Sequence, residues 1–112
     1  MNYKITTHNN VCVVAISGNI SREDRDSLVK CMEEIKEQDF NSAMIFFKNV
    51  EAIEVAVFRE LTMLQHEIRQ KRDRLHLVGL KNTLKIVLGE KGVIRGNEVI
   101  QDIEGLDKKT SA

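Results

Sequence analysis

The sequence contains no proline, no tryptophan and no long apolar run. Without proline-rich or low-complexity stretches, nothing divides the 112 residues into parts joined by linkers, and one domain is expected. The longest apolar runs, residues 11–16 and 43–47, are far shorter than the roughly 20 residues that cross a bilayer, so we expect no membrane insertion. The first eight residues also lack the apolar region of a secretory signal, which favours a cytoplasmic protein.

An excess of either charge is missing as well. Lysine plus arginine and aspartate plus glutamate number 17 each, and the two signs are interspersed along the chain. Proteins that bind a phosphate backbone usually carry a basic excess on one face. We therefore expect no nucleic-acid partner.

Residue patterns that hold metals or cofactors are also missing. His66 and Glu67 begin like the zinc-protease helix motif, but Gln70 stands where that motif needs its second histidine. The phosphate-binding patterns GxxxxGK[ST] and GxGxxG do not occur, and residues 89–92 follow a predicted helix, where they are typical of a cap and turn. No metal site and no cofactor are predicted.

The two cysteines, Cys12 and Cys31, both fall at apolar positions. Free cysteine commonly behaves as a small buried hydrophobe, so both are predicted to be core thiols rather than a disulfide. No nucleophile paired with a general base is visible, and no catalytic residue is predicted. The remaining enzymatic hypothesis places Glu54, Asn49 and Lys48 around a crevice at the carboxyl ends of the strands, where open α/β sheets usually bind ligands.

Apolar runs of strand length alternate with helical stripes. Strands are predicted at residues 3–7, 11–16, 43–47, 75–78 and 98–100. The first two are expected to pair as an antiparallel hairpin. Because parallel strands need a crossover that is usually helical, this order predicts an α/β fold.

Three helices are predicted between these strands, and each has a stripe of apolar residues. The first begins at Ser21, which can cap it, and stops near Asp39. The second runs from Val57. The third carries Leu80, Leu84, Val87 and Leu88, and Gly89 is expected to cap it. A terminal turn is predicted around residues 102–106.

Residues 50–61, which read VEAIEVAVFREL, resemble the pattern V-x-x-I-D-S-S-G-L-x-x-L of the STAS domain, the fold of bacterial anti-sigma factor antagonists. Residues 14–20 (VAISGNI) resemble that family's apolar strand and turn, and residues 75–79 (LHLVG) its next strand. The resemblance continues through Leu84, Leu88, Gly92 and Val93. It implies one STAS-like domain at residues 1–106, followed by a tail at residues 107–112. The implied fold is a mixed sheet of about five strands with about four helices, the first strand antiparallel.

The sequence departs from the family at its regulatory site. In the antagonists, a kinase that is also the anti-sigma factor phosphorylates the serine after the aspartate. Val55 and Ala56 have no hydroxyl here, so the usual switch cannot operate and no phosphorylation site is predicted at that place. A displaced site at one of three other hydroxyl residues is an alternative, although the first is better explained as a helix cap: Ser21, Thr62 and Thr83.

Glu54, in the place of the family's aspartate, has two interpretations. It caps or charges the start of the second helix, or it supplies a fixed negative charge at a partner surface. A one-residue shift of the alignment would make it a mimic of phosphoserine. The apolar residues that follow it are either buried or an interface.

The partner-binding residues predicted from this loop are Glu54, Val55, Ala56, Val57 and Arg59. Phe58 and Leu61 are predicted to be core. The resemblance implies a non-catalytic protein-interaction module, a regulator in a bacterial partner-switching pathway whose partner is a kinase-type anti-sigma factor. The alternative is a STAS-like accessory subunit of a transporter ATPase complex, and a homodimer is also compatible with the neutral surface.

Overall fold

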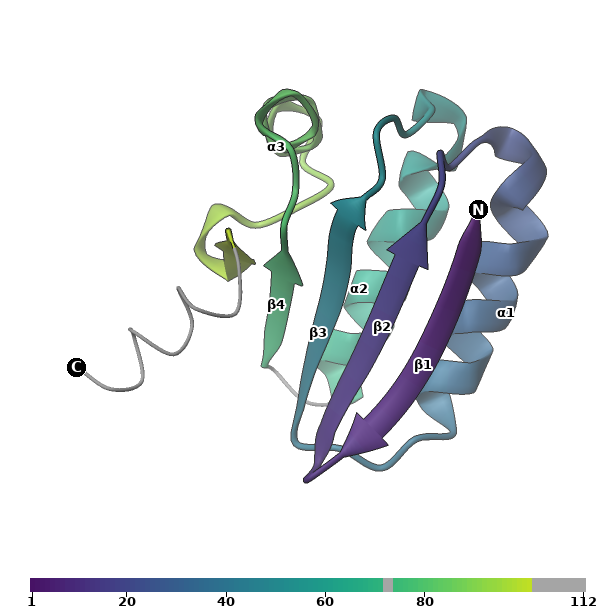
Figure 1. The fold of residues 1–112 in the computed structure, drawn as a ribbon, viewed down its shortest axis with the longest axis vertical. Coiled ribbons are helices and arrows are strands. Elements are labelled where there is room, and N and C mark those ends of the chain that lie inside the picture. Colours follow the sequence, from purple (N-terminus) through teal and green to yellow (C-terminus); the bar gives the residue numbers. More distant parts are fainter. Residues whose placement is uncertain (72–73, 102–112) are drawn as a thin grey trace.

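A computed structural model describes residues 1–71 and 74–101 of the chain. In this part, five strands form one sheet in the order β1-β2-β3-β4-β5, and α1 and α2 cover one face of it (Figure 1). The strands are β1 (Asn2–His8), β2 (Val11–Ser17), β3 (Ser42–Asn49), β4 (Leu75–Val78) and β5 (Val99–Ile100). β1 pairs with β2 antiparallel, and all the other pairs are parallel.

Three α-helices and three short 3-10 turns connect the strands within the described residues. The helices are α1 (Arg25–Lys36), α2 (Phe58–Lys71) and α3 (Asn82–Glu90), and the turns are η1 (Arg22–Asp24), η2 (Val55–Val57) and η3 (Gly96–Glu98). The predicted mixed α/β sheet is confirmed. The turn predicted at residues 102–106 and the tail at 107–112 lie outside the described residues. None of the described helices is long and apolar enough to cross a membrane.

The β1–β2 hairpin forms as predicted, around a two-residue turn. Asn9 and Asn10 both have positive φ, 51° and 65°, which is the pattern of a type I′ turn. Asparagine tolerates this left-handed conformation better than most residues. The turn fixes the register of the hairpin, in which Ile5 lies opposite Val14.

The core lies between the sheet and α1 with α2, and it contains both cysteines. Cys12 and Cys31 are free thiols and completely buried, as predicted. Burial raises the pKa of both, and with the nearby Glu34 carboxylate it raises the pKa of Cys31 to about 12. Both side chains therefore stay protonated at neutral pH and act as small apolar groups.

The ends of two helices differ from the prediction. α1 stops at Lys36 rather than near Asp39. Gly89 was expected to cap α3 but lies inside it. The cap is Gly92, which has a φ of 71°, and the N–H of Val93 donates to the Leu88 carbonyl at 2.8 Å. This is the Schellman arrangement, in which the residue of positive φ follows the helix and is usually glycine.

The apolar stripe predicted for α3 is correct at two of its positions within the helix and wrong at Val87. Leu84 and Leu88 are buried, but Val87 is 42% exposed. Val87 follows Leu84 by three residues and precedes Leu88 by one, so it falls at the margin of a narrow stripe. The fold therefore leaves this valine in water.

An ion pair covered by protein fastens β5 and η3 to α2. The Arg69 guanidinium donates to both carboxylate oxygens of Glu98 and to the Gln65 side-chain oxygen, and the Gln65 amide donates to the Leu61 carbonyl. Gln65 and Glu98 are 2% and 7% exposed. This network satisfies the polar groups that the core would otherwise leave unpaired.

Replacing Glu98 by glutamine should therefore destabilise the fold strongly. The substitution leaves the Arg69 charge without its carboxylate, and breaking a buried pair in this way costs about 3 kcal/mol. Urea unfolding of Glu98→Gln should show this loss, while Glu90→Gln on exposed α3 should change the free energy of unfolding by less than about 0.5 kcal/mol. Equal stability of the two variants would contradict the role assigned to the pair.

Candidate functional site

Two loops lie side by side at the carboxyl ends of β2 and β3. Residues 18–24 and 50–57, together called the paired loops here, are joined by a parallel bridge between Ile20 and Ile53. The Ile20 N–H donates to the Ala52 carbonyl at 3.0 Å, and the Glu54 N–H donates to the Ile20 carbonyl at 2.9 Å. The Ala52 N–H donates to the Asn19 side-chain oxygen at 3.0 Å. The pairing of the two strands thus continues past their ends.

Glu54 is exposed and bonds across the paired loops. It makes no side-chain hydrogen bond to the turn η2 that follows it. Instead, one carboxylate oxygen accepts the backbone N–H of Arg22, the first residue of η1, at 3.3 Å. A carboxylate at that place satisfies a free backbone donor and complements the positive end of a helical turn. Glu54 therefore caps the neighbouring loop rather than its own helix.

The three apolar residues after Glu54 do not share one environment. Val55 is 68% exposed, Ala56 is half-buried and Val57 is completely buried. A 3-10 turn has about three residues per turn, so neighbouring side chains point in different directions. The prediction that Val57 contacts a partner is wrong, because its side chain is enclosed by the core. Phe58 is also in the core, as predicted.

One arginine side chain binds η2, and two more arginines lie near it in the sequence or across the paired loops. One nitrogen of Arg25 donates to the Ala56 carbonyl at 2.9 Å, and another lies 3.4 Å from the Glu60 carboxylate. Arg22 and Arg59 are exposed, and neither is ion-paired within the described part of the chain. Arg22 and Arg25 were not predicted as site residues. The strand order could have indicated them, because loops that follow adjacent parallel strands meet at one edge of a sheet.

The residues of the enzymatic hypothesis do not converge. The Glu54 carboxylate is bound to the Arg22 backbone, and Lys48 contributes its carbonyl, which accepts a hydrogen bond from the Lys81 ammonium at 3.1 Å. Within residues 1–71 and 74–101, no side-chain hydrogen bond or ion pair joins Lys48, Asn49 and Glu54 to one another. The space between the paired loops and the sheet is filled by completely buried apolar side chains: Ile20, Val50 and Val57.

The first turn before α1 is held by Asp24. Its carboxylate accepts the Ser21 N–H at 2.8 Å and the Ser21 hydroxyl at 3.2 Å, and it lies 3.4 Å from the Met1 ammonium. The Ser21 backbone bond, helped by the ammonium, lowers the pKa of Asp24, although burial opposes the shift. Ser21 is the N-cap residue of η1, in agreement with its predicted capping role, but the α-helix predicted to begin there begins at Arg25.

The solved structures that resemble this chain share its fold. A putative anti-sigma factor antagonist from Thermotoga maritima superposes with a TM-score of 0.78 at 13% identity, over 98% of this chain and 95% of the other. The Bacillus anti-sigma factor antagonist SpoIIAA, in its unphosphorylated form, gives 0.74 at 12% identity over 99% and 98%. A sulfate transporter family protein from Wolinella succinogenes gives 0.72 at 21% identity over 89% and 84%.

No protein-family model and no curated protein matches the sequence. The similarity to solved structures establishes the fold, and it extends over nearly the whole length of the chain. The fold is that of the STAS domain, as the resemblance in the sequence implied.

Replacing Asp24 by asparagine should remove a stabilising contribution that depends on pH. Because the pKa of Asp24 is lower in the folded state, its contribution is present above the unfolded pKa and disappears as the pH falls through the folded pKa. We expect Asp24→Asn to cost about 1 kcal/mol at neutral pH and progressively less as the pH falls below the unfolded pKa of about 3.9. Urea unfolding at several pH values measures this difference. The exposed Asp39→Asn control should show no such trend, and a constant Asp24→Asn deficit would contradict the assignment.

Proposed function

We propose that this STAS-fold chain is a non-catalytic protein-interaction module that regulates a partner in a bacterial partner-switching pathway, without the usual phosphoserine. The observation that carries the proposal is the exposure of Val55. At 68%, it exceeds that of every other large apolar side chain in the described residues. The turn beneath it is held by the bonds between the paired loops. An apolar side chain presented on a fixed turn is suited to fill a pocket of a partner.

The groups around Val55 indicate the chemistry of that partner. Arg25 lies beside η2 through its bond to Ala56, and Arg59 lies in the first turn of α2, which directly follows η2. Arg22 lies across the paired loops, where its backbone N–H binds the Glu54 carboxylate, and Arg25 is paired with Glu60. A partner surface with an apolar pocket for Val55 and acidic groups for the exposed Arg22 and Arg59 would complement this arrangement.

The surface extends along the seam between α1 and α2. Two ion pairs cross the seam, Arg25 with Glu60 and Lys36 with Glu67. Two exposed apolar residues, Val29 on α1 and Met63 on α2, fall between these pairs along their helices. The proposed partner surface therefore consists of Glu54, Val55, Ala56 and Arg59, with Arg22, Arg25, Val29 and Met63 beside them.

Regulation by phosphate at this surface is disfavoured. Val55 and Ala56 carry no hydroxyl. Of the displaced candidates, the Ser21 hydroxyl donates to Asp24 and the Thr62 hydroxyl donates to the Phe58 carbonyl at 2.8 Å. The third, Thr83, is exposed on α3, outside the proposed surface. We therefore propose that a kinase-type anti-sigma factor is bound constitutively. A second candidate function is an accessory subunit of a transporter ATPase complex, and the similarity to the sulfate transporter family protein supports an association with a transporter.

The test is to compare partner binding by the native chain with that by Val55→Asp. The tagged proteins are incubated with lysate of the source cell, captured proteins are identified by mass spectrometry, and the purified partner is titrated by calorimetry. We expect a histidine-kinase-like ATPase, bound at least about tenfold more weakly by Val55→Asp, because the carboxylate must be desolvated in an apolar pocket.

Ile86→Asp is the matched control, because Ile86 is 59% exposed on α3. It should bind like the native chain. Capture of a transporter ATPase with the same sensitivity to Val55→Asp would select the second candidate. Unchanged affinity of Val55→Asp for the captured partner would overturn the proposed surface. Intact mass of protein from its own cell should show no species heavier by one phosphate group.

A further inference from the structure

β1 leaves one side of its backbone unpaired. It lies at the end of the sheet, and among the described residues only β2 pairs with it. In a two-residue type I′ hairpin, the residues that flank the turn are hydrogen-bonded to each other, and bonded and non-bonded pairs alternate from there. His8 and Val11 flank the turn and form the first hydrogen-bonded pair. Every second residue of β1 from there, which includes Thr6 and Lys4, also directs its backbone N–H and C=O toward β2.

The same alternation gives the outer edge three donors and three acceptors. They are the N–H and C=O groups of Tyr3, Ile5 and Thr7. On β2, the residues between the bonded pairs direct their backbone groups toward β3 instead of β1. The hydrogen bond from the Gly18 N–H to the Asn49 carbonyl of β3 follows this alternation. An exposed row of this kind is a template for another strand.

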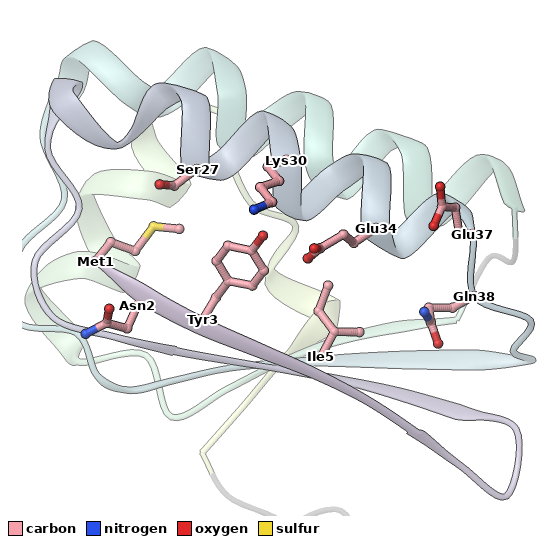
Figure 2. A pocket seen from close by; sticks show the side chains of 9 residues that line it. All are labelled: Met1, Asn2, Tyr3, Ile5, Ser27, Lys30, Glu34, Glu37 and Gln38. Carbon is pink, nitrogen blue, oxygen red and sulfur yellow. The ribbon is translucent and has the colours of Figure 1, made fainter.

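A groove runs along this edge beneath α1. It has a volume of about 680 Å³, and Figure 2 shows the side chains of β1 and α1 facing each other across it. Tyr3 and Ile5 lie on the strand side, and they pack against the core. Lys30, Glu34 and Glu37 line the side of α1. The groove thus has the half-buried Tyr3 and Ile5 at its base and a charged rim. The rim carries the Glu34 and Glu37 carboxylates and Lys30, and Met1, whose ammonium is paired with Asp24, also lines the groove.

We propose that the edge of β1 and the groove beneath α1 form a second docking site, which takes an extended, basic peptide segment as an additional strand. Backbone bonds to Tyr3, Ile5 and Thr7 hold the segment, and the side chains of one of its faces enter the groove. Lysine or arginine on that face complements Glu34 and Glu37. Burial, and then the Glu34 carboxylate, raise the pKa of Tyr3 to about 12, which keeps its hydroxyl neutral beside the segment.

A single strand fits this site better than a second copy of the chain. Figure 1 shows α1 projecting past the outer side of β1. A second copy that paired through its own β1 would bring its own α1 into the space that the first α1 occupies. A peptide brings no helix, and its strand would lie directly under α1.

The probe is a peptide whose groove-facing residues are set by design. In acetyl-Thr-Val-Thr-Arg-Thr-Arg-Thr-Val-Thr-amide, the valines and arginines fall on one face of an extended chain. Its counterpart carries glutamate in place of both arginines. Each is titrated into the full chain, and amide chemical shifts and hydrogen exchange are followed by NMR. We expect the basic peptide to bind with a Kd of about 1 mM or tighter and to slow exchange at Tyr3, Ile5 and Thr7.

In the free chain, these three amides should exchange fast, while those of Lys4 and Thr6 are already protected by β2. The acidic peptide, and the basic peptide on the Glu34→Gln, Glu37→Gln double variant, should bind about fivefold more weakly. Glu33→Gln, an exposed change on α1 outside the groove, should leave binding unchanged.

Three results would overturn the docking site: no protection of the three edge amides, equal binding of the two peptides, or concentration-dependent protection without peptide, which would mean that copies pair with each other. Val55→Asp should bind the peptide like the native chain, so the failure of one surface is distinguishable from the failure of the other.

Discussion

The parallel pairing of β2 with β3 continues past the ends of the two strands, and the exposed surface around Val55 depends on this continuation. The bridge between Ile20 and Ile53 and the two backbone bonds beside it hold the paired loops in register. In this register, Val57 is buried in the core, and Val55, on the same short turn, is exposed to solvent. The backbone pairing of the two loops thereby determines which residue of the turn faces solvent.

The two proposed docking surfaces have separate physical origins. The surface around Val55 exists because parallel strands bring their loops to one end of the sheet. The edge of β1 exists because the first strand is antiparallel and terminal, so no neighbour satisfies its outer backbone groups. One surface recognises by an apolar side chain and charge, the other by backbone hydrogen bonds. A partner of one therefore need not resemble a partner of the other.

The sequence predicts most of the fold and only part of the site. The strands and buried residues follow from local apolar patterns, whereas the site depends on contacts between segments far apart in the sequence. β4 spans residues 75–78 as predicted, and Cys12 and Cys31 are buried, because both follow from local apolar patterns. Gly89 and Gly92 are both plausible caps by composition, and tertiary packing decides between them. Likewise, a run of small apolar residues does not reveal which of Val55 and Val57 faces water, since a 3-10 turn has neither the period of a helix nor that of a strand.

Glu54, which the resemblance aligns with the aspartate of the STAS pattern, does more than carry a charge. Its carboxylate accepts the Arg22 N–H and so takes part in holding the paired loops together, a role that no sequence pattern in its own segment indicates. A charge used in this way is fixed in place and cannot be added or removed as a phosphate can. If Val55 binds a partner at this turn, the chain itself offers no hydroxyl there to end the contact. Release would then depend on a change in the partner rather than in this chain.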